Sequence, residues 1–387
     1  MRSPSFGFPT RLAAFYGAIF VLTGVQLPFF PVWLKAKELD PTLIGIVLAM
    51  PMVIRVIAIP FAAREADRRD ALRAAIMGLS VASVAGFALL GFSEGAVAIF
   101  VANIVASLVF TPIMPLAEAY ALKGLAARGR VYGPVRLWGS AAFIVGTFVA
   151  GFAADLVSPL SLIWLIVAAS VLTAVAAVSL APLSTGAPEP PAAGLPLLQG
   201  RRWIGRAFLA VAIGASLIQA SHAVYYGFSA LAWRAAGYDG ATVGALWALG
   251  VLAEIVLFAV QGRLPIFLTP VRLMMVGAAG AAIRWGAMAF DPPFGMLLIL
   301  QTLHGLSFAA THVGALTFIA RSAPLGQAAT AQAYLAMALG VGMAAAIAGS
   351  GWLYENFGSG AYAAMALAAV AGGVCCVVAY TARRGLP

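Results

Sequence analysis

Charged residues are scarce in this chain, and their scarcity excludes an ordinary soluble fold. Asp, Glu, Lys and Arg make up 9% of the 387 residues, whereas hydrophobic residues make up 63%. A soluble domain carries roughly 25% charged residues because its surface faces water. A chain of this length cannot hide so much apolar surface inside itself, so we expect its main solvent to be lipid.

Groups that carry out enzyme chemistry are equally sparse. The two cysteines, Cys375 and Cys376, are neighbours in an apolar run, where packing is expected rather than a disulfide or a metal site. No Walker A sequence is present, so ATP is not the expected energy source. His304 and His312 have no carboxylate at coordinating spacing. We therefore expect no enzyme, no metal and no cofactor. The net charge of +10 does not indicate nucleic-acid binding, because the basic residues form small clusters between apolar runs.

Apolar runs of about 20 residues, by contrast, recur along the whole chain, and each predicts a membrane-spanning helix. The predicted helices cover 11–35, 42–63, 71–93, 95–123, 131–154, 159–182, 204–234, 241–262, 271–290, 293–320, 327–352 and 359–382. Residues 183–203 are rich in proline, glycine and charge, which is typical of a linker. We predict an all-α membrane protein with twelve transmembrane helices, as an N-terminal six-helix bundle (1–182), a cytoplasmic linker and a C-terminal six-helix bundle (204–387).

Weak matches at a nearly constant offset support two related halves. Ile44-Gly45 matches Val243-Gly244, and ten residues later each span carries an ionisable group, Arg55 in one and Glu254 in the other. Gly151 to Asp155 likewise matches Gly351 to Glu355. Because six predicted spans separate the copies, the halves have the same topology, as parallel repeats do.

The distribution of Lys and Arg predicts the orientation. The side that holds both termini and 183–203 carries seventeen of the 23 basic residues, and the other side carries Lys35, Lys37 and Arg234. Cytoplasmic loops of membrane proteins carry such an excess. We expect a multi-pass protein of the cell inner (cytoplasmic) membrane with both termini in the cytoplasm.

Five charged residues lie in the interior of predicted spans, at least five positions from either end, where an unpaired charge costs several kcal/mol unless it faces a wet cavity. They are Arg55, Glu118, Arg136, Glu254 and Arg284. Cations exceed carboxylates by one, so a bound anion would complete the neutralisation, and arginine binds carboxylates bidentately. We hypothesise a cavity for a small organic anion with Arg136 as the leading substrate cation. Its apolar walls would come from aromatic residues, namely Phe143, Tyr225, Tyr226, Trp247 and Trp138. A structural salt bridge between Glu118 and Arg136 is the competing interpretation.

At these residues the chain resembles the major facilitator superfamily, in the branch that contains lactose permease and the phenylpropionate permeases. Pro28-Phe-Phe-Pro-Val-Trp-Leu34 resembles the end of that branch's first helix. Glu118 and Arg136 have the spacing of the carboxylate and guanidinium that hold the sugar, and Phe143 takes the place of the stacking aromatic residue. Arg284 and His304 resemble the coupling arginine and histidine. The resemblance implies a monomeric transporter of a small-molecule substrate, driven by the proton gradient as the halves rock.

The chain also departs from that branch. Where lactose permease has a proton-carrying carboxylate, this sequence has Ser307, which cannot titrate. We therefore favour Glu254 as the proton carrier, with Glu118 and His304 as further candidates. The superfamily loop after the second helix is degenerate but keeps Asp67 among arginines, so Asp67 is a candidate gating residue. Arg55, in the second span, is a candidate interior charge.

The phenylpropionate side of the branch fits these departures better, and the predicted function is proton-coupled import of an aromatic monocarboxylate. A sugar, oligosaccharide or nucleoside proton symporter is the main alternative. Drug efflux and a membrane receptor that does not transport its ligand are further alternatives.

Overall fold

The computed structural model describes residues 7–130, 132–183, 205–323 and 327–384, and every regular element in these ranges is a helix. Ten helical segments in them are long and apolar enough to cross a membrane. The last segment, Thr330–Ala382, contains two helices, and helix α11 (Pro270–Met288) is not one of the ten. The predicted all-α membrane class is confirmed, and each of the twelve predicted ranges coincides with helical structure.

The chain divides into two compact units. The first comprises Met1–Pro191 with Trp233–Ala248, and the second comprises Ala192–Ala232 with Leu249–Pro387. The predicted linker, 183–203, lies outside the described residues except for Leu183.

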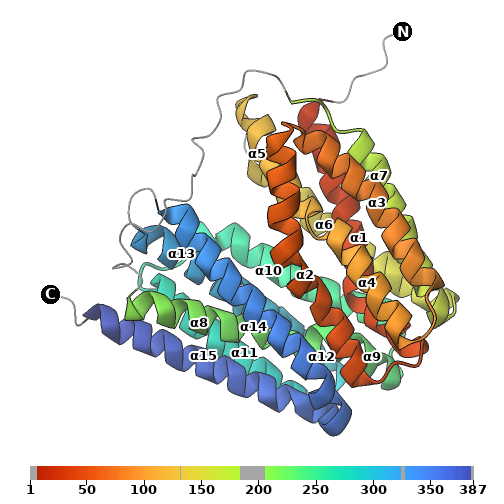
Figure 1. Cartoon of the computed structure of the whole chain (residues 1–387). Coiled ribbons are helices and arrows are strands. Elements are labelled where there is room, and N and C mark those ends of the chain that lie inside the picture. Colours follow the sequence, from red (N-terminus) through yellow and green to blue (C-terminus); the bar gives the residue numbers. More distant parts are fainter. Residues whose placement is uncertain (1–6, 131, 184–204, 324–326, 385–387) are drawn as a thin grey trace. The chain divides into compact units, whose positions relative to one another are not determined.

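The first unit is a bundle of helices that follow one another along the chain (Figure 1). They are α1 (Phe8–Ala36), α2 (Pro41–Arg68), α3 (Leu72–Phe92), α4 (Ala96–Phe110), α5 (Ile113–Ala126), α6 (Tyr132–Leu156), the 3-10 turn η1 (Pro159–Ser161) and α7 (Leu162–Val178). The unit also takes in the end of α9 (Ala223–Ala235) and the start of α10 (Gly240–Val260).

Glycines bring α1 and α6 into close contact (Figure 1). A Cβ at Gly146 would lie 2.6 Å from the carbonyl oxygen of Val21, and a Cβ at Gly24 would strike the carbonyl oxygen of Phe143. Small residues let helix backbones approach in lipid, where dispersion rather than the hydrophobic effect drives association. The contact positions α6, which carries Arg136, against α1.

Proline in α2 leaves a carbonyl that another helix satisfies. Pro51 has no N–H, so the carbonyl oxygen of Val47 lacks its helical donor. The side chain of Asn103, on α4 and 2% exposed, donates to that oxygen from Nδ2 over 2.8 Å. An apolar environment makes such a bond valuable because no water is available as a substitute. The amide therefore fixes α2 against α4.

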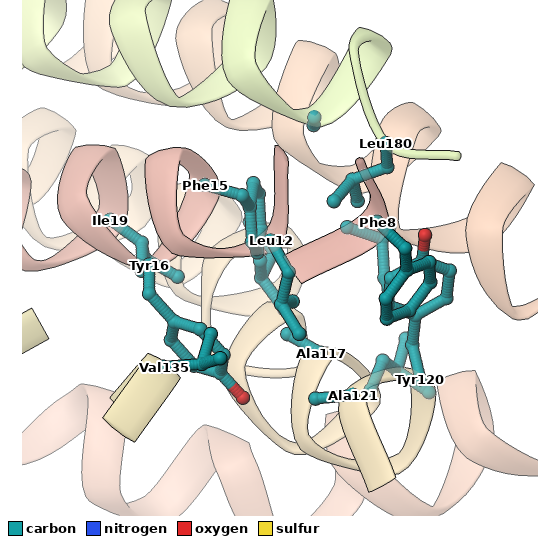
Figure 2. Close-up of a cluster of buried hydrophobic side chains, with 14 of the residues drawn as sticks. Phe8, Leu12, Phe15, Tyr16, Ile19, Ala117, Tyr120, Ala121, Val135 and Leu180 are labelled. Atoms are coloured by element: carbon teal, nitrogen blue, oxygen red, sulfur yellow. The ribbon is translucent and has the colours of Figure 1, made fainter. Parts of the chain in front are cut away.

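Aromatic side chains pack at one end of the first unit. Figure 2 shows Phe8, Leu12, Phe15, Tyr16 and Ile19 of α1 with residues of α5 and α6 and with Leu180, which follows α7. The rings of Phe8 and Tyr120 stack at 5.2 Å, and the Tyr120 hydroxyl donates to the carbonyl oxygen of Ala181 over 2.5 Å. This cluster buries the first turns of α1 and places Tyr16 beside α6.

A carboxylate at the end of α6 caps the start of α10. Asp155 accepts from the backbone N–H groups of Gly240 and Ala241 over 2.7 and 3.1 Å, and it forms an ion pair with Arg234. A Cβ on Gly151 would collide with the backbone of Gly240. The end of α6 and the start of α10, which belong to the fifth and eighth predicted spans, are therefore in contact.

The second unit contains the rest of α9 and α10 and the helices on either side of them in sequence (Figure 1). These are α8 (Arg206–Ala220), the 3-10 turn η3 (Gln261–Arg263), α11, α12 (Phe294–Thr302), the π-helix η4 (Gly305–Ala310), α13 (Thr311–Ser322), α14 (Ala328–Phe357), η5 (Gly358–Gly360) and α15 (Ala361–Arg384). Within this unit α8 packs against α14 and α15, and α11 packs against α13 and α15.

Three predicted spans are interrupted rather than continuous. Residues 95–123 divide into α4 and α5 at Pro112, 204–234 divide into α8 and α9 at Ser221 and His222, and 293–320 contain the π-helix η4. Pro112 cannot donate a helical bond, and π-helical turns are frequent at functional sites. Each of these ranges still forms one segment long enough to cross a membrane, but the interruptions were not predicted, and two of them contain or adjoin the histidines His222 and His304.

Candidate functional site

Each unit holds buried or half-buried ionisable residues, and those of the first unit include Arg136 and Glu118. Arg136, in the first turns of α6, is partly exposed. Its guanidinium lies 4.2 Å from the ring centroid of Phe20 and 5.9 Å from that of Tyr16. Aromatic faces attract a guanidinium through the ring quadrupole but leave its N–H groups able to donate in the guanidinium plane. Arg136 is therefore held by rings while its fork of donors stays available.

The predicted partner of Arg136 does not bind it directly. Glu118 is half-buried on α5, and in the described part of the chain no ion pair within 4.0 Å joins it to Arg136. Both side chains interact electrostatically with the phenol of Tyr16, which is fully buried. Glu118 and Arg136 therefore do not form a direct salt bridge in the described structure, and both lie near the buried ring of Tyr16. Tyr16 was not predicted from the sequence, because a tyrosine in an apolar first helix has no distinctive spacing.

The predicted aromatic residues are divided between the units. Phe143 is buried on α6 beside α1, and Trp247 is buried on the part of α10 that belongs to the first unit. Tyr225 and Tyr226 lie on α9 in the second unit, the former buried and the latter partly exposed. Only Trp138 is largely exposed among those named, at 64%, which suits a lipid-facing position better than a cavity wall.

The second unit is organised around Arg284, which is fully buried on α11. Its Nη2 donates to Oε1 of Gln301 over 2.7 Å, and its Nη1 donates to Nδ1 of His304 over 2.9 Å and to Oγ of Ser307 over 3.4 Å. The guanidinium also lies 4.6 Å from the ring centroid of Tyr225. Sequence analysis expected Arg284 beside His304, and the two are in contact. Gln301 was missed, although it lies three residues before His304 and so on the same helical face.

These contacts fix the direction of every hydrogen bond that leaves Arg284. Arginine can only donate, so Nδ1 of His304 accepts, and a neutral His304 carries its proton on Nε2. Nε2 of His304 lies 3.7 Å from Oε2 of Glu254 on α10. The proton-bearing nitrogen therefore faces the carboxylate that we favoured as the proton carrier.

A second chain of hydrogen bonds runs through Ser307. Its hydroxyl lies 3.1 Å from Nε2 of His222, and Nδ1 of His222 lies 3.1 Å from the carbonyl oxygen of Gln219. That carbonyl can only accept, so a neutral His222 carries its proton on Nδ1 and accepts from Ser307. Ser307, which stands where lactose permease has a carboxylate, thus links Arg284 to the buried His222.

Arg55 and Asp67, the remaining predicted residues, are both exposed on α2. The guanidinium of Arg55 lies 3.8 Å from Sδ of Met52. At the end of α2 the carboxylate of Glu65 pairs with both Arg68 and Arg69. Glu65, rather than Asp67, holds the arginines of this loop. Among the described residues no group of three His, Cys, Asp or Glu side chains is placed to hold a metal ion.

Comparison with known proteins identifies the fold. The family described as "MFS_1 like family" matches residues 9–364. The chain is 32% identical over 366 residues to the Escherichia coli (strain K12) protein named "Probable 3-phenylpropionic acid transporter", covering 93% of this chain and 94% of that protein. It is 27% identical over 364 residues to the maltose permease of Geobacillus stearothermophilus, covering 91% and 89%.

Solved structures with low sequence identity share the architecture. The nucleoside transporter NupG is 17% identical with a TM-score of 0.78, covering 99% of this chain and 100% of that one. The POT family transporter PepTSo is 14% identical with a TM-score of 0.71, covering 98% of each chain. These likenesses confirm the predicted fold, and the family match confirms the resemblance to the major facilitator superfamily.

Proposed function

The chain belongs to the MFS_1 like family of membrane transporters, and we propose that it imports a small aromatic carboxylate together with protons by alternating access. A transporter, not an enzyme, is the function of this family. The proposed substrate class is supported by the name of the 32% identical relative and by two arginines, Arg136 in the first unit and Arg284 in the second.

Arg136 carries the proposal of an organic anion. Its guanidinium is stacked on Phe20 and, among the described residues, has no carboxylate within ion-pair distance. A carboxylate that arrives with the substrate would accept two parallel N–H bonds from it, and the partly exposed ring of Phe20 offers apolar surface for an aromatic group. An arginine that is oriented by rings but not neutralised by protein is suited to an anionic ligand.

Proton coupling is proposed to pass through Glu254. Protonation of His304 at Nδ1 would break the bond that Arg284 donates to it, so His304 is better suited to orient the neighbouring carboxylate than to carry a second proton. The side chain of Glu254 is 20% exposed, whereas that of His304 is 8% exposed. The carboxylate is therefore the more accessible of these two titratable groups.

A neutral sugar or nucleoside is the second candidate substrate, supported by the relative named as a maltose permease and by Glu118, which suits hydroxyl groups. A thermal-shift screen of purified protein decides between the classes, because a ligand stabilises the state that binds it. We expect 3-phenylpropionate and related acids to raise the melting temperature, and sugars and nucleosides to leave it unchanged. Stabilisation by sugars or nucleosides alone would replace the proposal with the second candidate.

We further propose that the protein works as a monomer in the cell inner membrane with both termini in the cytoplasm. The excess of Lys and Arg on the side of the termini supports this orientation. Labelling of single cysteines placed at the two termini with a membrane-impermeant reagent tests this orientation. The cytoplasmic side faces outward only in inverted vesicles, so we expect labelling there and none in right-side-out vesicles.

A further inference from the structure

Five buried side-chain polar atoms in the second unit have no hydrogen-bond partner among the described residues. Two are Oε1 of Gln219 and Oγ of Ser229, and the other three are Nε of Arg284, Nε2 of Gln301 and the hydroxyl of Tyr362. Arg284 and Gln301 are fully buried, and Tyr362 is 2% exposed. A buried donor without an acceptor destabilises the folded state, so three in one region need an explanation.

The three groups belong to one network of contacts. Nη2 of Arg284 donates to Oε1 of Gln301, and because arginine cannot accept, the amide orientation of Gln301 is fixed and its NH2 group is the unpaired end. The ring of Trp285 contacts both Arg284 and Tyr362. The ring centroid lies 4.4 Å from the guanidinium carbon of Arg284, and the ring stacks on that of Tyr362 with the centroids 5.7 Å apart.

The charge of Arg284 is also left without a directly bound counter-ion. No carboxylate in the described part of the second unit lies within 4.0 Å of the guanidinium. Glu254 is separated from it by the imidazole of His304. A buried charge that lacks a partner costs several kcal/mol. The network therefore has both an excess of donors and an excess of positive charge.

We propose that the second unit binds a small anion, either a halide ion or a single carboxylate group, at Nε of Arg284, Nε2 of Gln301 and the hydroxyl of Tyr362. Arg284 and Gln301 can only donate at these atoms, which excludes a metal cation. A water molecule would accept the donors but leave the charge of Arg284 unbalanced. The site would bind an anion whatever the chain transports, and so it stands apart from the proposed function.

Thermal unfolding of the purified full-length protein in detergent tests the site without any transported substrate. One arm replaces sodium isethionate, whose anion is larger, with sodium bromide at constant ionic strength, and a second arm uses sodium acetate. We expect the melting temperature to rise with the logarithm of the concentration of one small anion, because a ligand that binds only the folded state stabilises it by mass action. Bromide and acetate identify a halide site and a carboxylate site, respectively. Equal melting temperatures in all three salts would overturn the proposal.

Two variants locate the effect. Gln301→Glu puts a carboxylate beside Arg284, and we expect it to raise the melting temperature in isethionate and to abolish the dependence on bromide or acetate. Tyr362→Phe removes one donor and should raise the half-saturating concentration about tenfold, which corresponds to about 1.4 kcal/mol. Tyr120→Phe, a buried tyrosine of the first unit, is the matched control and should leave the half-saturating concentration unchanged.

An anion effect that persists unchanged in Gln301→Glu would place the ion elsewhere and overturn the assignment. If either variant fails to fold, crystals of the wild-type protein grown in bromide decide the question. An anomalous peak beside Arg284 and Gln301 supports a halide there, and an anomalous map without such a peak, together with no effect of acetate, rejects the site.

Discussion

Nη1 of Arg284 donates to Nδ1 of His304 over 2.9 Å, and this contact determines which imidazole nitrogen carries the proton beside Glu254. A histidine whose Nδ1 accepts must carry its remaining proton on Nε2, the atom 3.7 Å from the Glu254 carboxylate. Arg284 therefore acts on Glu254 through an imidazole of fixed tautomer. Movement of α11 relative to His304, which lies between α12 and η4, would change that contact and the environment of the carboxylate together.

Replacing Glu254 tests its role as the proton carrier. In Glu254→Gln we expect counterflow exchange of substrate to continue, because binding and rocking do not need a titrating group at this position. Accumulation driven by a pH gradient should be lost. Glu94→Gln, which changes an exposed carboxylate that pairs with Lys37, is the matched control. Accumulation by Glu254→Gln up a proton gradient at the wild-type level would assign the proton to another residue.

Removing the hydroxyl of Ser307 should destabilise the second unit. Ser307→Ala leaves Nε2 of His222 without its donor and takes one acceptor from Arg284, so we expect a loss of about 1–3 kcal/mol in the free energy of unfolding. Ser350 is buried in the same unit, and its hydroxyl donates only locally, to the carbonyl oxygen of Ile347. Ser350→Ala should cost clearly less in the same denaturation assay. Equal losses for the two variants would show that the link through Ser307 contributes nothing of its own.

The proline of α2 and the asparagine of α4 should be energetically coupled. Asn103→Leu leaves the carbonyl oxygen of Val47 buried without a donor, and we expect a cost of about 1–3 kcal/mol. Pro51→Ala supplies the missing backbone N–H to the same oxygen. The double variant should therefore regain stability relative to Asn103→Leu, and a double-mutant cycle measures this coupling. Strict additivity of the two substitutions would contradict the assignment of Asn103 as the substitute donor.

Apolar run length was enough to predict the helical class and the positions of the spans, because the bilayer imposes one length on every segment that crosses it. Interruptions at Pro112, at Ser221 and in η4 were not predicted. Hydropathy does not register a break that polar side chains and neighbouring helices satisfy.

The candidate site was predicted in part. Charge inside apolar runs singled out Arg136, Arg284 and Glu254, since lipid makes such residues rare. Spacing alone suggested that Glu118 would meet Arg136, but the structure places the Tyr16 phenol within electrostatic reach of both. Gln301 escaped notice because an uncharged amide in an apolar helix carries no signal until the tertiary structure brings Arg284 to it.

Uptake of labelled 3-phenylpropionate into proteoliposomes tests the central claim most directly. With an acidic exterior and equal amounts of reconstituted protein, we predict that the wild-type protein accumulates the acid and that a protonophore abolishes the accumulation. Arg136→Gln should lower the initial rate at least about tenfold, since a charge-assisted hydrogen bond contributes about 1.5–3 kcal/mol. Accumulation by Arg136→Gln at the wild-type rate, or no accumulation by the wild-type protein, would contradict the account.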